Sequence, residues 1–142
     1  MITMCNLNTK KRCNFVENKK RIFVLGNLLV KEDALAIELI PELKKKFPDI
    51  DFTEFDPLEE IESEKAIFID VVEGIKNVEI IRDLRKIETR KIYSTHDFDA
   101  AILLKILKKL GIIKEIIILG IPKGMKKKEA LRELEKEIRK IF

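Results

Sequence analysis

The sequence predicts an α/β domain, in which a mostly parallel sheet of about five strands carries helices on both faces. Short apolar runs alternate with amphipathic segments, as in strands joined by helical crossovers. The 142 residues fit one domain with a sizeable core. Because 46% of the residues are hydrophobic and these are mixed with the charges, the chain is not of the disordered class.

The domain is expected to span residues 19–142, because no linker or internal repeat divides this part of the chain. Residues 1–18 are polar, contain four Asn and show no periodicity, so we predict a mobile N-terminal arm.

The first predicted strand covers residues 21–25 and ends at the turn signal of Gly26 and Asn27. A helical pattern begins at Glu32, and Pro41 is expected to kink or split this helix because proline lacks a backbone N–H. The apolar face of the helix consists of Leu35, Leu39 and Leu43.

Four further strands are predicted. Residues 51–55 and 78–81 form short candidates, and residues 66–72 form a nearly continuous apolar run that suits a central strand covered on both faces. Residues 115–119 form the last strand, which we expect to end at the Gly120-Ile121-Pro122 turn.

Two more helices complete the expected order of strand, helix, three strands, helix, strand and helix. Residues 98–110 carry a clear apolar stripe, and Gly111 is the expected stop residue. Residues 126–142 form a highly charged helix with a narrow apolar stripe of Leu131, Leu134, Ile138 and Ile141.

Composition excludes several classes of protein. His96 is the single histidine, which rules out a multi-histidine zinc site, and Cys5 and Cys13 are too few for a zinc ribbon or a secreted disulfide framework. No apolar run approaches the roughly 20 residues that cross a bilayer, and the first residues lack the apolar core of a signal peptide. We therefore expect a soluble, cytoplasmic protein with no membrane partner. Abundant Lys and Glu with no Gln suggest a thermophile.

Nucleic-acid and nucleotide partners are disfavoured. The net charge of +4 comes from 29 Lys and Arg against 25 Asp and Glu, and the basic C-terminal helix also carries many Glu, which favours a solvated helix face. RNA-stacking aromatic residues are few. Gly26 alone does not make a dinucleotide fingerprint, although a small nucleotide-binding domain stays a third hypothesis.

Polar residues that can carry chemistry stand near the predicted strand ends. Glu32 and Asp33 follow the first strand after a short loop, Asp70 closes the apolar run of the third, and His96 precedes the 98–110 helix. Parallel sheets bind ligands beyond the carboxyl ends of their strands, where the strand order reverses. We therefore expect these side chains to cluster.

Each residue also has a purely structural interpretation. Asp70 is costly to bury unless it is paired or coordinated, but a strand-end aspartate also caps a neighbouring backbone. Glu32 and Asp33 suit the first turn of any helix, where carboxylates meet the positive end of the dipole. His96 fits a helix cap beside Asp97. Together, one imidazole and two or more carboxylates form a mixed ligand set that suits a divalent transition metal.

Four segments in order resemble the nickel-iron hydrogenase maturation endopeptidases. Residues 22–36 resemble the family's opening strand, Gly-Asn loop and acidic pair. Residues 66–71 resemble its third-strand segment with an aspartate, and residues 94–97 its histidine segment before a helix. Residues 119–122 resemble its late Gly-x-Pro turn, so the resemblance extends from residue 19 to about residue 125.

The resemblance implies a three-layer α/β/α sandwich and a processing endopeptidase of the aspartyl type. Such an enzyme removes a C-terminal extension from the hydrogenase large-subunit precursor after nickel insertion. By resemblance, Asp33, Asp70 and His96 are the metal ligands and catalytic residues, and Gly26 and Asn27 form the adjoining loop. The nickel arrives with the precursor, which is the implied partner, and a monomer is favoured. Water would be the attacking group, because the single histidine belongs to the metal site.

Three positions depart from the family pattern. Val24 stands where the family has the first glycine of Gly-x-Gly-Asn, and Ala34 and Ala36 stand where a glycine usually follows the acidic pair. Glu32 is the alternate acid of the first motif. These departures motivate a second hypothesis, a non-enzymatic module that binds nickel or the precursor with the same fold.

Overall fold

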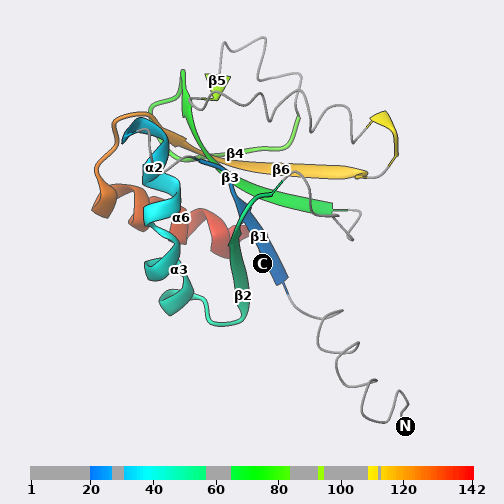
Figure 1. Cartoon of the computed structure of the whole chain (residues 1–142), viewed down its shortest axis with the longest axis horizontal. Helices are drawn as coiled ribbons and strands as arrows, with labels where there is room; N and C mark the ends of the chain where they lie inside the picture. Colours follow the sequence, from blue (N-terminus) through cyan, green and yellow to red (C-terminus); the bar gives the residue numbers. More distant parts are fainter. Residues whose placement is uncertain (1–19, 27–30, 57–64, 84–92, 95–108, 112) are drawn as a thin grey trace, which may run out of the picture.

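A single sheet organises the computed structural model, which describes residues 20–26, 31–56, 65–83, 93–94, 109–111 and 113–142 (Figure 1). In these residues the sheet has six strands in the order β2-β1-β3-β6-β4, with β5 beside β3. The strands are β1 (Lys20–Val24), β2 (Ile50–Glu54), β3 (Lys65–Glu73), β4 (Glu79–Ile81), β5 (Tyr93–Ser94) and β6 (Glu115–Pro122).

The sheet is mostly parallel, which confirms the predicted α/β class. Strands β2, β1, β3 and β6 run parallel to one another, whereas β4 pairs with β6 and β5 pairs with β3 in the antiparallel sense. All five predicted strands are present with small shifts of their ends, and β5 is an addition. The buried pattern of β3, with every residue from Ala66 to Val72 inaccessible, is that of a central strand.

Strand β6 continues past the point where a turn was expected. Gly120, Ile121 and Pro122 pair with Asp70, Val71 and Val72 of β3, so the prediction that these residues end the strand is wrong. The partner strand β3 is long and apolar, so its pairing with β6 continues up to Val72 and Pro122. Pro122 is tolerated because it is the last residue of β6. The chain leaves the sheet at Lys123, whose backbone N–H donates to the carbonyl oxygen of Val72 at 2.9 Å.

The first helical segment is split, as Pro41 predicted. Helix α2 (Lys31–Glu38) and helix α3 (Ile40–Lys46) meet at Leu39, and Pro41 stands in the first turn of α3. At the break the N–H of Leu39 is shared between the carbonyl oxygens of Leu35 and Ala36, at 3.2 and 3.3 Å. The C-terminal helix α6 (Lys127–Ile141) was also predicted.

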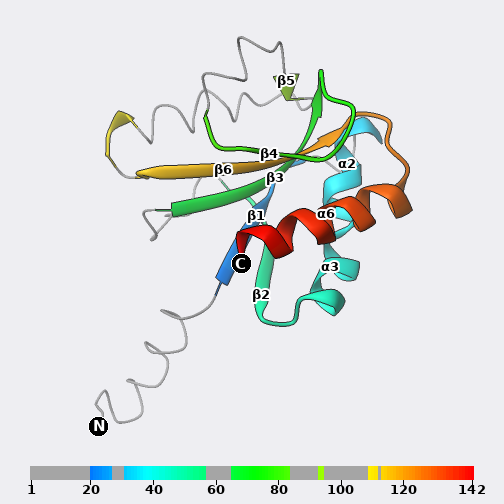
Figure 2. The same cartoon turned by 180° about the vertical axis from the view of Figure 1, so that it is seen from behind.

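Helices α2, α3 and α6 all lie on one face of the sheet (Figures 1 and 2). They cover the odd-numbered side chains of β3 and β6, such as Ile69 and Leu119, and the even-numbered side chains Ile22 and Val24 of β1. The even-numbered side chains of β3 and β6 face the opposite side, where Phe68 contacts the rings of Phe23 and Phe55. Strands β1, β3 and β6 therefore send alternate side chains into two separate cores.

Several predictions lie outside the described residues. They are the N-terminal arm and the helix 98–110 up to residue 108. Its predicted stop residue, Gly111, has the left-handed φ of +83° that favours glycine after a helix. Within the described part of the chain, no helix is long and apolar enough to span a membrane.

Candidate functional site

The strand order reverses between β1 and β3. The chain moves from β1 outward to β2, then crosses back over β1 to β3. Connections on the two sides of such a point leave the sheet in different directions, which opens a crevice at the carboxyl ends of the two strands. The carboxyl ends of β1 and β3 are therefore where the fold predicts a ligand site.

Asp70 lies in β3 at this point. Its residue exposure is 5%, and in the described part of the chain it is the one buried charged residue. The N–H of Leu25, directly after β1, donates to the carbonyl oxygen of Ile69 at 2.8 Å, so Asp70 follows the last contact with β1. Strand β3 runs on for three more residues to Glu73, so the expectation that Asp70 closes the apolar run at the strand end is wrong. The carboxylate of Asp70 thus belongs to strand β3, which continues after its neighbour β1 has ended.

The segment after β1 leads to Asp33. Gly26 follows Leu25, and Asn27 lies outside the described residues. The backbone of Asp33, with that of Glu32, lies in the first turn of α2. Ala36 and Ile37, three and four residues later, are buried in the core, and α2 contacts β3. The first turn of α2 therefore starts near the carboxyl ends of β1 and β3.

His96 itself lies outside the described residues, but the segment just before it is placed. Ser94 pairs with Val72, and Tyr93 pairs with Glu73, in the antiparallel bridge between β5 and β3. Val72 is two residues after Asp70. Sequence reasoning did not predict this bridge, because two residues are too few to show a strand period.

A row of three residues crosses the sheet at Asp70. The register pairs Asp70 with Gly120 of β6, and Gly120 with Glu79 of β4. Directly paired residues share a face, so both carboxylates belong to the same face of the sheet, on strands about 10 Å apart. Glu79 is half-buried.

The position between these two carboxylates is occupied by Gly120, and neighbouring side chains leave little room there for a larger residue. A Cβ atom at this position would lie 3.1 Å from Cγ2 of Val72 and 3.2 Å from Cδ1 of Ile75. Glu79 and the structural role of Gly120 were missed from the sequence. A glycine inside an apolar run was the available signal, since it marks a close approach in a strand.

The structure places the three predicted metal ligands to different extents. Asp70 is at the strand-order reversal, Asp33 is located by its backbone, and His96 is outside the described residues. Among the side chains that the structure describes, no three His, Cys, Asp or Glu groups gather to hold a metal ion. The convergence of Asp33, Asp70 and His96 stays a prediction.

Comparison with known proteins finds likeness at the level of structure. No protein-family model and no curated protein matches the sequence. The crystal structure of the hydrogenase 3 maturation protease is similar over 84% of this chain and 88% of that one, with 19% identity and a TM-score of 0.56. The crystal structure of an uncharacterized protein from Wolinella succinogenes is similar over 87% of this chain and 99% of that one, with 19% identity and a TM-score of 0.53. At this identity the two likenesses establish a shared fold.

Proposed function

We propose that this protein is a processing endopeptidase that removes the C-terminal extension of a nickel-iron hydrogenase large-subunit precursor once nickel has been inserted. The observation that carries the proposal is the buried Asp70, which lies at the strand-order reversal of a fold shared with the hydrogenase 3 maturation protease. The four family-like segments, in order along the chain, support the same assignment.

In this proposal, Asp33, Asp70 and His96 recognise the nickel that the precursor carries. Their elements are compatible with this role. Ser94 is bridged to Val72, and the two residues from Ser94 to His96 span at most about 7 Å. The start of α2 brings Asp33 to the same edge of the sheet. One imidazole and two carboxylates leave positions on the metal for ligands from the precursor.

The proposed chemistry is the hydrolysis of one peptide bond. Water attacks the scissile carbonyl carbon, the C–N bond breaks, and the leaving amine takes up a proton. A carboxylate of the site orients the water and accepts its proton. The substrate's nickel positions the precursor and polarises the carbonyl oxygen.

Replacing the buried carboxylate tests the proposal. We expect Asp70→Asn to reduce the trimming of a nickel-loaded large-subunit precursor by at least about 100-fold, because the amide keeps the shape and loses the charge. Mass spectrometry of the precursor measures the loss of its C-terminal peptide. Asp49→Asn is the matched control, since Asp49 is exposed in the turn before β2. It should trim at the wild-type rate.

The other two predicted ligands extend the test. Asp33→Asn and His96→Gln should each abolish trimming while thermal unfolding remains cooperative. Full processing by these two variants and by Asp70→Asn would sink the assignment.

The alternative is a binding module that holds nickel or the precursor without cleaving it. Val24, at the family's first glycine position, favours this alternative. Its side chain is fully buried in the core, whereas a glycine would have no side chain at this position. A loop beside a bulky residue adopts a different shape from a loop beside glycine. Incubation with nickel-loaded precursor separates the two functions. Binding without a loss of mass would favour the module.

A further inference from the structure

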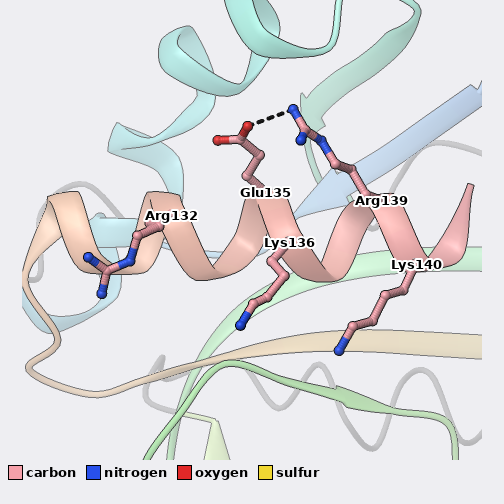
Figure 3. A pocket seen from close by; sticks show the side chains of 5 residues that line it. All are labelled: Arg132, Glu135, Lys136, Arg139 and Lys140. Carbon is pink, nitrogen blue, oxygen red and sulfur yellow. Dashed lines mark hydrogen bonds and ion pairs between the residues drawn. The ribbon is translucent and has the colours of Figure 1, made fainter.

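Helix α6 presents a basic surface on the outside of the helical layer. Arg132, Lys136, Arg139 and Lys140 are all exposed, and with Glu135 they line an open groove of about 410 Å³ (Figure 3). We call the four cations and this groove the α6 surface. It lies on the helix-covered face of the sheet, and Asp70 belongs to the opposite face.

Three of the four glutamates of α6 are engaged with the protein, and the fourth, Glu129, is exposed in the first turn. Glu133, Glu135 and Glu137 are half-buried, and an oxygen of Glu133 accepts a hydrogen bond from the backbone N–H of Val78 at 2.9 Å. Glu135 forms ion pairs with Lys46 of α3 at 3.4 Å and with Arg139 at 2.7 Å. The charge that faces solvent is therefore more basic than the composition of the helix indicates.

Three of the cations form a row along the helix. Arg132, Lys136 and Lys140 are spaced four residues apart, so consecutive members are separated by about 6 Å along the axis. Figure 3 shows Lys136 and Lys140 directed to the same side of the helix. Lys140 pairs with Glu137 at 2.9 Å. No ion pair joins Arg132 or Lys136 to another described side chain.

These features favour an acidic protein over a nucleic acid. A nucleic-acid backbone prefers an uninterrupted cationic track, whereas Glu135 adds a carboxylate to this groove. Stacking on aromatic rings is a main source of affinity for single strands. Among the described residues, Phe142 is the exposed aromatic residue near the α6 surface, and its ring already faces Nζ of Lys20 at 5.1 Å. The separate carboxylates of an acidic protein segment match the row of cations better than a continuous phosphate backbone does.

We infer that the α6 surface docks an acidic segment of a protein partner, whose carboxylates pair with Arg132 and Lys136. Partner carboxylates also compete with Glu137 for Lys140. This inference is independent of the proposed peptidase activity, because it requires no cleavage.

Charge reversal on α6 tests the inference, with a fluorescently labelled decaglutamate peptide as the probe. Anisotropy at low ionic strength should show that Lys136→Glu binds the peptide at least about fivefold more weakly than the wild type does. The new glutamate has Lys140 four residues later and Arg132 four residues earlier, so the helix should form normally. An unchanged melting temperature checks this.

Lys109→Glu is the matched control, because it changes the net charge equally. The exposed 109–111 segment precedes β6 and lies away from α6 in both views (Figures 1 and 2). It should weaken binding by less than about twofold. Equal losses in the two variants would overturn the inference, since only net charge would then matter. A labelled 20-base oligonucleotide, single- or double-stranded, that bound more tightly than decaglutamate and lost affinity with Lys136→Glu would also overturn it, in favour of nucleic acid.

Discussion

At the scale of single residues, Asp70 and Gly120 occupy adjacent positions at the centre of the sheet. Asp70 could be singled out from the sequence because it stands within an apolar run. A buried carboxylate is costly unless it is paired or coordinated, so such a residue marks a candidate site. The glycine was misread, because Gly-x-Pro also signals a turn. Only the folded structure reveals that the side chains of Val72 and Ile75 fill the space beside it.

Gly120→Val should destabilise the protein by about 1–3 kcal/mol, since its β-branched side chain overpacks this space. Urea unfolding followed by circular dichroism measures the change. Gly111→Ala is an informative companion. No atom lies within 4 Å of its added Cβ, so any loss there comes from the φ of +83° and amounts to about 1–2 kcal/mol. A Gly120→Val variant as stable as the wild type would contradict the packing described here.

At the scale of elements, the described strands other than β5 and the helices α2, α3 and α6 followed closely from sequence periodicity. The break at Pro41 was predictable because proline lacks the N–H that an intact helix needs. The stripe on α6 was predicted in position, but the deepest contacts are made by Ala130, Leu134 and Ile138. Leu131 only flanks the core, because the narrow stripe of a surface helix leaves its edge residues half-exposed.

Leu134→Ala should therefore cost about 2–5 kcal/mol of unfolding free energy, because its side chain is fully buried between α6 and the sheet. Leu131→Ala makes the same chemical change on the same helix at a half-buried position, and we expect a cost of about 1 kcal/mol or less. Chemical denaturation of the two variants gives the difference. Equal costs would mean that α6 is rotated about its axis relative to the structure.

At the scale of the whole molecule, the mostly parallel sheet was predictable from apolar runs that alternate with helices. The order of its strands was not, because pairing depends on contacts between distant residues. The same reason limits the site. Sequence spacing placed Asp33, Asp70 and His96 near strand ends, but the distances between their side chains depend on how separate connections pack together.

Amide hydrogen exchange should be slowest in β3 and β6. Each has hydrogen-bonded neighbours on both sides, whereas β2 and β4 form the edges of the sheet. Mass spectrometry of peptic peptides resolves these strands. Protection of β2 or β4 that exceeded that of β3 would be inconsistent with the observed strand order.

The two faces of the sheet have a practical consequence for measurement. Because the α6 surface and Asp70 belong to opposite faces, a molecule held on a negatively charged sensor chip through α6 has Asp70 on its far side. The Asp70 side would then be turned toward the solution. Molecules held through α6 would present this side to a binding partner in the flowing solution, without a chemical tag.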